Sequence, residues 1–185
     1  MCNCFVQGLF FLYNRAFFCY TVSVVKFCRE VAFMTDFHTL CLNVEGLIGG
    51  VPHLIANLAN ASAALWEAMA DINWAGFYLM EGDKLVLGPF QGKPACIEIA
   101  LHRGVCGAAV TTGETQLVPD VHQFPGHIAC DAASRSEVVV PIRAHGEIVA
   151  VLDVDSPIPG RFTEADKAGL EQLAAVVERE LAELW

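Results

Sequence analysis

The sequence predicts an α+β fold, in which helices pack on one face of a mainly antiparallel sheet. Two observations carry this prediction. Helical spacing of apolar residues occurs near both ends of the region 34–185. Between those ends lie short segments rich in aromatic and β-branched residues, joined by tight turns. Strands joined by tight turns pair antiparallel, and the helices then cover the sheet.

Four helices are expected along the chain. Three have one apolar face at helical spacing, and the third in chain order consists of small residues between two glycines. The predicted helices are 36–46, 53–70, 104–112 and 163–184. The first is followed by Gly49-Gly50-Val51-Pro52, which breaks the chain. Thr163 is a good N-cap for the last helix, with Glu164 and Asp166 in its first turn.

Six segments read as strands. Residues 71–80 and 84–90 form a hairpin through Glu81-Gly82-Asp83, and residues 137–143 and 147–155 form another through Ala144-His145-Gly146. Two shorter strands are expected at 95–101 and 115–119. Residues 120–134 have no clean period and read as a long loop with one helical turn. A loop of that length inside a compact domain is usually functional.

Composition restricts the class of protein. The chain has 185 residues, 55% of them hydrophobic, which suits one domain, or one domain plus an appendage. Its net charge is −10 and its pI is about 4.9, so no nucleic-acid partner is expected.

Residues 1–33 differ from the rest of the chain. They carry a charge of +2, from three basic residues and one acidic residue, which leaves −12 for residues 34–185. We expect a non-native or disordered extension, with translation starting at Met34, and a single domain over 34–185. A membrane or targeting element and ordinary structure are the alternatives. The uncharged run 1–14 is shorter than the roughly 20 apolar residues of a membrane span, and no small-x-small cleavage site follows residues 16–25.

Eight cysteines are unevenly distributed. Five lie in the first 41 residues, and Cys41 is expected to be a small buried residue of a helix. Cys96, Cys106 and Cys130 lie within one 35-residue window, each two to four residues after a glycine, on or near a turn. Cysteines in turns can approach one another. Either these are small buried residues, or they perform thiol–disulfide chemistry in a reducing compartment.

A zinc site is the other chemistry that these residues allow. His122, His127 and Cys130 lie close together in the sequence, with Cys106 upstream. Structural zinc sites usually have paired spacings such as Cys-x₂-Cys, and no such pair accompanies the two histidines. We therefore expect no metal.

Acidic residues gather on two neighbouring strands. Asp153 and Asp155 share one face of the strand 147–155, and Glu137 begins the strand before it. Two carboxylates on one face repel each other unless a cation lies between them. Arg135, Arg161 or a ligand ammonium group can supply that charge. The alternative is a strand that simply runs out into solvent.

Trp74 and Tyr78 share one face of the first strand, where they are either core or one wall of a pocket. Thiols, carboxylates and aromatic side chains together describe a small-molecule thiol oxidoreductase.

Four stretches closely resemble the free methionine-(R)-sulfoxide reductases. The likeness runs from about Thr35 to the end of the chain, and residues 1–33 match nothing in the family. The resemblance implies a GAF fold, an antiparallel sheet of about six strands flanked by helices. The four stretches are NWAGFYLMEGDKLVLGPFQGKPAC, GVCGAAV, DVHQFPGHIACDAASRSEVVVPI and AVLDVDSPIPGRFTEAD.

The resemblance also implies the chemistry. Free L-methionine-(R)-S-oxide is the implied substrate, and Cys130 is the implied nucleophile, which becomes a sulfenic acid. Cys96 is then expected to resolve it as a disulfide, with Cys106 as an additional or alternative recycling thiol. A thioredoxin-like dithiol would complete the cycle.

The family's substrate-binding residues match five positions here, and no cofactor is implied. Those positions are Glu137, Asp153 and Asp155 in the carboxylate cluster, and Trp74 and Tyr78 in the aromatic wall. One carboxyl group, held neutral by its neighbours, can protonate the sulfoxide oxygen. A cytoplasmic homodimer without membrane association is expected.

Two alternatives remain open. One is a GAF-type domain that binds a small ligand without turnover and signals through a separate protein. The other is an interaction domain that uses its last helix for assembly. Neither explains the three cysteines, and a site for an anionic nucleotide is not expected to be lined by three carboxylates.

Overall fold

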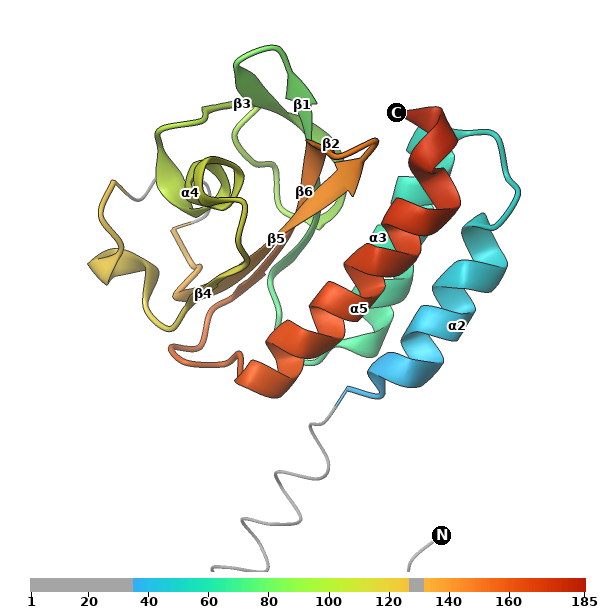
Figure 1. The fold of residues 1–185 in the computed structure, drawn as a ribbon. Coiled ribbons are helices and arrows are strands. Elements are labelled where there is room, and N and C mark those ends of the chain that lie inside the picture. The colour runs from blue at the N-terminus through green and yellow to red at the C-terminus, as the bar shows by residue number, and fades with distance from the viewer. Residues whose placement is uncertain (1–34, 127–131) are drawn as a thin grey trace, which may run out of the picture. The chain divides into compact units, whose positions relative to one another are not determined.

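The computed structural model describes residues 35–126 and 132–185, and Thr35–Trp185 form one compact unit. Figure 1 shows the helices and strands of this unit in chain order. Their bounds are α2 Phe37–Ile48, α3 Leu54–Ala68, β1 Trp74–Glu81, β2 Lys84–Gly92, β3 Glu98–Ala100, α4 Gly104–Thr112, β4 Gln116–Val118, η1 Val121–Gln123, β5 Ser136–Ala144, β6 Glu147–Ser156, α5 Glu164–Leu181 and η2 Ala182–Leu184.

The strands form one six-stranded sheet in the order β3-β2-β1-β6-β5-β4. Every pair of neighbouring strands is antiparallel, as expected from the sequence. The two predicted hairpins, β1–β2 and β5–β6, are both present. They meet at the centre of the sheet, where β1 pairs with β6, so strands from distant parts of the sequence lie side by side.

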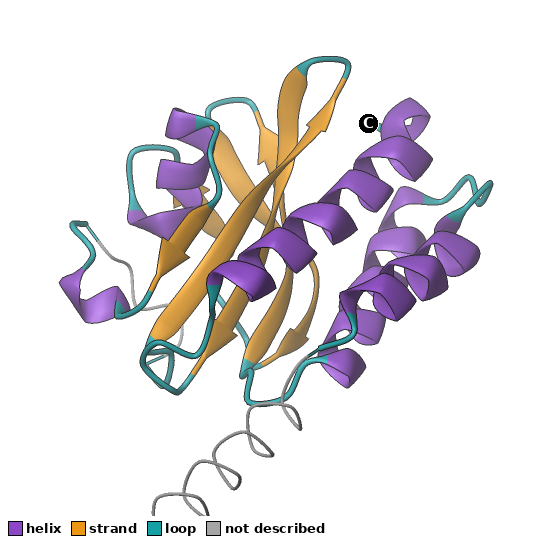
Figure 2. Ribbon diagram, turned by 60° about the horizontal axis from the view of Figure 1, so that its bottom comes forward, coloured by secondary structure: helices purple, strands orange, loops and turns teal. Residues whose placement is uncertain are grey.

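The helices divide between the two faces of the sheet. α3 and α5 pack on one face and α2 packs against these two helices, and the core on this side includes Leu58, Leu152 and Leu173. α4 packs on the other face, against β5 and β6, with a second core that includes Tyr78 and Val151. Figure 2 shows helices on both sides of the strands. The prediction that the helices share one face is therefore wrong for α4, because its small residues gave no sign of which face they cover.

The element boundaries follow the sequence closely. α4 has the predicted bounds, whereas α5 ends at Leu181 and continues as the short 3₁₀ helix η2. Thr163 caps α5 as expected, and forms a reciprocal pair of hydrogen bonds with Asp166. The two short strands shrink to three residues each. No helix in the described ranges is long and apolar enough to cross a bilayer.

Candidate active site

The face of the sheet under α4 carries the predicted site residues on three adjacent strands. β1, β6 and β5 run side by side, and their register places polar and aromatic side chains in successive rows. The first row is Trp74, Asp155 and Glu137, the second is Gly76, Asp153 and Val139, and the third is Tyr78, Val151 and Pro141. The structure therefore brings all five predicted binding residues onto one face.

Cys106 lies over the carboxylates. It is the third residue of α4, so it lies in the first turn of a helix and not in the turn that precedes it. Its thiol donates to Asp153 Oδ2 at 3.4 Å and lies 4.0 Å from Glu137 Oε1. Cys106 is 4% exposed, and Glu137 and Asp153 are each 6% exposed. The alternative of a strand that runs out into solvent is therefore wrong, because Asp153 is buried beneath Cys106 of α4 and Asp155 is half-buried.

Burial changes the protonation of these three groups. Burial raises the pKa of Asp153 to about 7. It also raises the pKa of Glu137 well above its usual range, and the negative charges of Asp153 and Asp155 raise it further. The pKa of the Cys106 thiol rises for the same reasons, burial first and the neighbouring carboxylates second. The site therefore holds protons near neutral pH, as expected when like charges share a buried space.

Neither arginine proposed as a counter-ion for the carboxylates pairs with them. Arg135 forms an ion pair with Asp120 at 3.9 Å, and Arg161 forms one with Asp166 at 3.4 Å. The remaining candidate is a cationic group on a ligand. An ammonium group would favour the ionised carboxylates, and its binding would release protons from the cluster.

The aromatic residues form a stacked wall beside the carboxylates. The Trp74 and Tyr78 rings lie 5.7 Å apart, and Phe90 of β2 stacks on Trp74 at 5.2 Å. Sequence reasoning missed Phe90. Its signal is Gly76, the residue that pairs with it: a Cβ there would lie 2.3 Å from the Phe90 Cβ, so only glycine leaves room for the ring.

The predicted cysteines are not all placed. Cys96 is half-buried and packs against the core that contains Trp74 and Tyr78, and its carbonyl accepts a hydrogen bond of 3.1 Å from the Tyr78 hydroxyl. Cys130 lies outside the described residues, as does His127. The described residues on both sides of Cys130 form hydrogen bonds with segments of the site. The Gly126 carbonyl accepts from Gly104 N at the start of α4, and Ser134 Oγ accepts from Asn73, next to Trp74.

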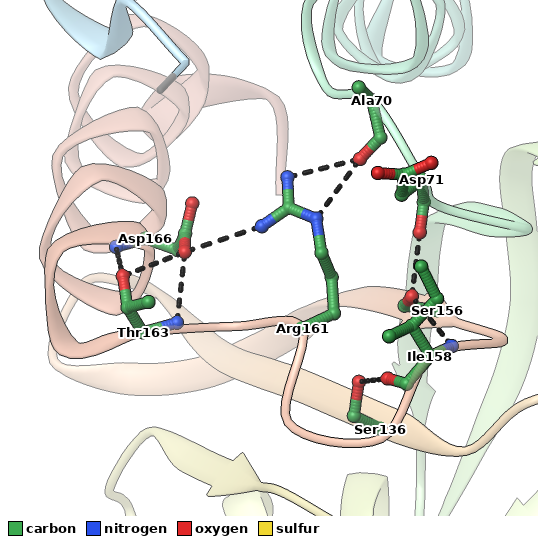
Figure 3. Close-up of polar contacts among 8 residues, drawn as sticks. All are labelled: Ala70, Asp71, Ser136, Ser156, Ile158, Arg161, Thr163 and Asp166. Carbon is green, nitrogen blue, oxygen red and sulfur yellow. Dashed lines mark hydrogen bonds and ion pairs between the residues drawn. The ribbon is translucent and has the colours of Figure 1, made fainter. Parts of the chain in front are cut away.

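A set of hydrogen bonds, two of them partly buried, fastens the strand ends that carry the site (Figure 3). Ser156 donates to the Asp71 carbonyl at 2.6 Å, and Ser136 donates to the Ile158 carbonyl at 2.7 Å. Arg161 donates to the Ala70 carbonyl at 3.0 Å. These contacts join the start of β1 and the start of β5 to the segment after β6. Sequence reasoning missed them, because isolated serines carry no local signal of a distant partner.

The donor atoms of the cluster also allow a metal to be considered. Cys106, Glu137 and Asp153 each bring one donor atom within 4.8 Å of the others. This is not the histidine set considered from the sequence. One thiol and two carboxylates differ from the cysteine and histidine sets of structural zinc. Within the described residues, Asp153 Oδ1 and the Trp74 indole N–H are buried without a hydrogen-bond partner, so an acceptor and a donor remain for a small polar ligand.

Comparison with known proteins adds independent information. The GAF domain family model matches residues 52–181. The chain is 54% identical over 149 residues to the free methionine-R-sulfoxide reductase of Escherichia coli, covering 80% of this chain and 90% of that protein.

The solved structures that are similar to the chain include two with bound substrate. The fRMsr of Staphylococcus aureus, in complex with substrate, is 50% identical with a TM-score of 0.77, over 80% of this chain and 97% of that one. Free methionine-R-sulfoxide reductase from Neisseria meningitidis, in complex with its substrate, is 42% identical with a TM-score of 0.76, over 80% and 89%.

Proposed function

The chain belongs to the free methionine-R-sulfoxide reductases, which are built on the GAF fold, and on that premise we propose that it reduces free L-methionine-(R)-S-oxide to L-methionine. The observation that carries the proposal is the buried pair Glu137 and Asp153 beside the aromatic wall. A carboxyl group with a pKa of about 7 is suited to protonate a sulfoxide oxygen near neutral pH.

The substrate is a zwitterion with a small polar sulfoxide, and the site offers a partner for each part. One carboxyl group of the cluster Glu137, Asp153 and Asp155 keeps its proton for the sulfoxide oxygen, and the other two receive the ammonium group. The faces of Trp74 and Tyr78 contact the methyl group and the sulfur, because aromatic rings bind polarisable sulfur favourably. The same carboxylates disfavour an anionic nucleotide, which argues against the ligand-sensor alternative.

The cycle balances with thiols alone. The Cys130 thiolate attacks the sulfoxide sulfur while a carboxyl group protonates the oxygen, which passes to Cys130 as a sulfenic acid and releases methionine. The Cys96 thiolate then attacks the Cys130 sulfur, water leaves, and a disulfide forms. A dithiol of the thioredoxin class returns both cysteines to thiols and is itself oxidised. The cycle needs no metal or prosthetic group.

Cys106 has a different environment from an attacking thiolate. Buried carboxylates raise its pKa, which keeps it protonated and unreactive at neutral pH. We therefore assign the thiol cycle to Cys130 and Cys96 and give Cys106 no attacking step in it.

Thioredoxin-coupled turnover of the purified protein tests the function. NADPH should be consumed with free L-methionine-(R)-S-oxide and not with the S epimer. Absence of turnover above background with the R epimer would overturn the proposal. Cys41→Ser is a matched control, since Cys41 lies in α2 away from the acidic cluster.

Single-turnover measurements separate the cysteines. Cys130→Ser should release no methionine. Cys96→Ser should release about one methionine per enzyme and then stall, whereas Cys106→Ser should complete the first turnover and form the Cys96–Cys130 disulfide. Full activity of Cys130→Ser would show that the nucleophile is another thiol.

Two further measurements test the other expectations. Turnover should continue in the presence of a metal chelator. Light scattering should give the mass of the homodimer that the family leads us to expect.

A further inference from the structure

Ile97 is the most exposed of the large apolar side chains in the described part of the chain, at 71%. The next are Ile55 at 57% and Leu42 at 55%, both on helices. A single exposed apolar residue is ordinary on a protein surface and needs no explanation by itself. What distinguishes Ile97 is its position, directly after Cys96.

The backbone separates these two neighbours. The Ile97 carbonyl accepts a hydrogen bond of 2.9 Å from Leu87 N, which extends the pairing of β3 with β2 by one step. Cys96 is half-buried and packs with the core that holds Trp74 and Tyr78, whereas Ile97, in the bend just before β3, is exposed to solvent. The Tyr78 hydroxyl bond to the Cys96 carbonyl holds this orientation.

The surroundings of Ile97 resemble those of an interface anchor. The segment lies beside β3, the edge strand of the sheet. Lys93, Pro94 and Glu98 are exposed around it, and Glu98 forms an ion pair of 2.6 Å with Lys84. A central apolar side chain with a polar rim is typical of protein–protein contacts.

The reduction of the oxidised enzyme indicates which kind of partner would contact the surface around Ile97. In the oxidised enzyme a thiolate of the reductant attacks one sulfur of the Cys96–Cys130 disulfide and forms a mixed disulfide, while the other cysteine leaves as a thiolate. The second thiol of the reductant then attacks the mixed disulfide, which frees the enzyme thiol and leaves the reductant oxidised. A protein reductant must therefore make surface contact beside Cys96. Cys106, at 4% exposure, does not offer such access.

We propose that Ile97, with Lys93, Pro94 and Glu98 around it, is the docking surface for a protein dithiol reductant. The proposal rests on the proposed function, because it needs Cys96 in the disulfide. Contacts between redox partners are small, so one apolar anchor carries a large share of the affinity.

The test compares two reductants on one variant. Ile97→Ser should lower kcat/KM for thioredoxin about tenfold, because a buried apolar anchor is lost. With dithiothreitol, which needs no docking surface, the variant should keep the parent rate and the parent KM for methionine sulfoxide. Ile55→Ser is the matched control, as it removes the same side chain at similar exposure from α3.

Two results would overturn the docking surface. One is a thioredoxin-dependent rate for Ile97→Ser equal to that of the parent. The other is an equal loss with both reductants, which would place Ile97 in the chemistry rather than in docking. Failure of the proposed function looks different, because the parent itself would then reduce no sulfoxide with either reductant.

Discussion

Asp153 combines two properties that suit a proton donor for sulfoxide reduction: it is 6% exposed, and burial raises its pKa to about 7. It also accepts a hydrogen bond of 3.4 Å from the Cys106 thiol. Glu137 shares the same buried space, and its pKa is raised as well. The proton therefore belongs to the pair, and substrate binding redistributes it.

Replacing Asp153 with asparagine tests its role at the scale of one residue. Asp153→Asn keeps the shape of the side chain but removes the acid, so kcat should fall by about a hundredfold or more. In the parent, kcat/KM should decline as the pH rises through about 7, because the donor is lost on ionisation. The variant should lack that limb of the pH profile.

Asp83→Asn serves as the control for this substitution, since Asp83 is exposed in the β1–β2 turn. If Asp153→Asn retained both the rate and the decline of the parent, another group would be the donor. Glu137→Gln would then be the next variant to measure.

At the scale of one element, β1 shows how a strand is specialised for a site. Its residues alternate between the two cores, with Phe77 facing α2, α3 and α5, and Trp74 and Tyr78 facing α4. Gly76 lies between the two aromatic residues and beside Phe90. A side chain at that position would push Phe90 away and break the stacked wall.

Gly76→Ala should therefore lower stability and binding together. The free energy of unfolding should fall by about 1–3 kcal/mol, the usual cost of overpacking, when measured by urea denaturation. KM for the sulfoxide should rise. Gly46→Ala is the matched control, because a Cβ at that position in α2 meets nothing within 4 Å. The control should be neutral or more stable, since alanine suits a helix better than glycine.

For the whole molecule, the buried acids make stability depend on pH. The pKa of Asp153 is higher in the folded chain than its ordinary value of 3.8, so the folded state binds more protons between pH 4 and 7. The free energy of unfolding should then fall as the pH rises through that range, by up to about 1.4 kcal/mol per pH unit for this group. Urea denaturation at several pH values measures the slope, and Asp153→Asn should flatten it. A steeper slope in the variant would contradict the assignment.

The extent of the folded domain is also a property of the whole molecule. Thr35–Trp185 form a compact unit with its own cores, and the GAF family match lies within it at residues 52–181. We expect a chain that begins at Met34 to keep the parent's turnover and its midpoint of urea denaturation. A loss of either would show that residues 1–33 contribute to the domain, contrary to our prediction from their composition.

Much of the fold was predictable from local signals. The Thr163 cap of α5, the hairpin turns and the alternation in β6 depend on residues close in sequence, and all appear as expected. The position of α4 was not predictable, because its small residues do not mark one apolar face. Phe90 and Ser156 were missed for a related reason: their partners Trp74 and Asp71 are distant in the chain.

The sequence by itself determined the chemical groups of the candidate site and the faces of the strands that carry them, since side-chain direction in a strand alternates with residue number. It also identified the family, through long local motifs. Only the tertiary structure decided that Cys106 covers Glu137 and Asp153, and that Arg135 and Arg161 pair elsewhere. Those facts set the charge of the site, and they arise from contacts between distant segments, which no local pattern specifies.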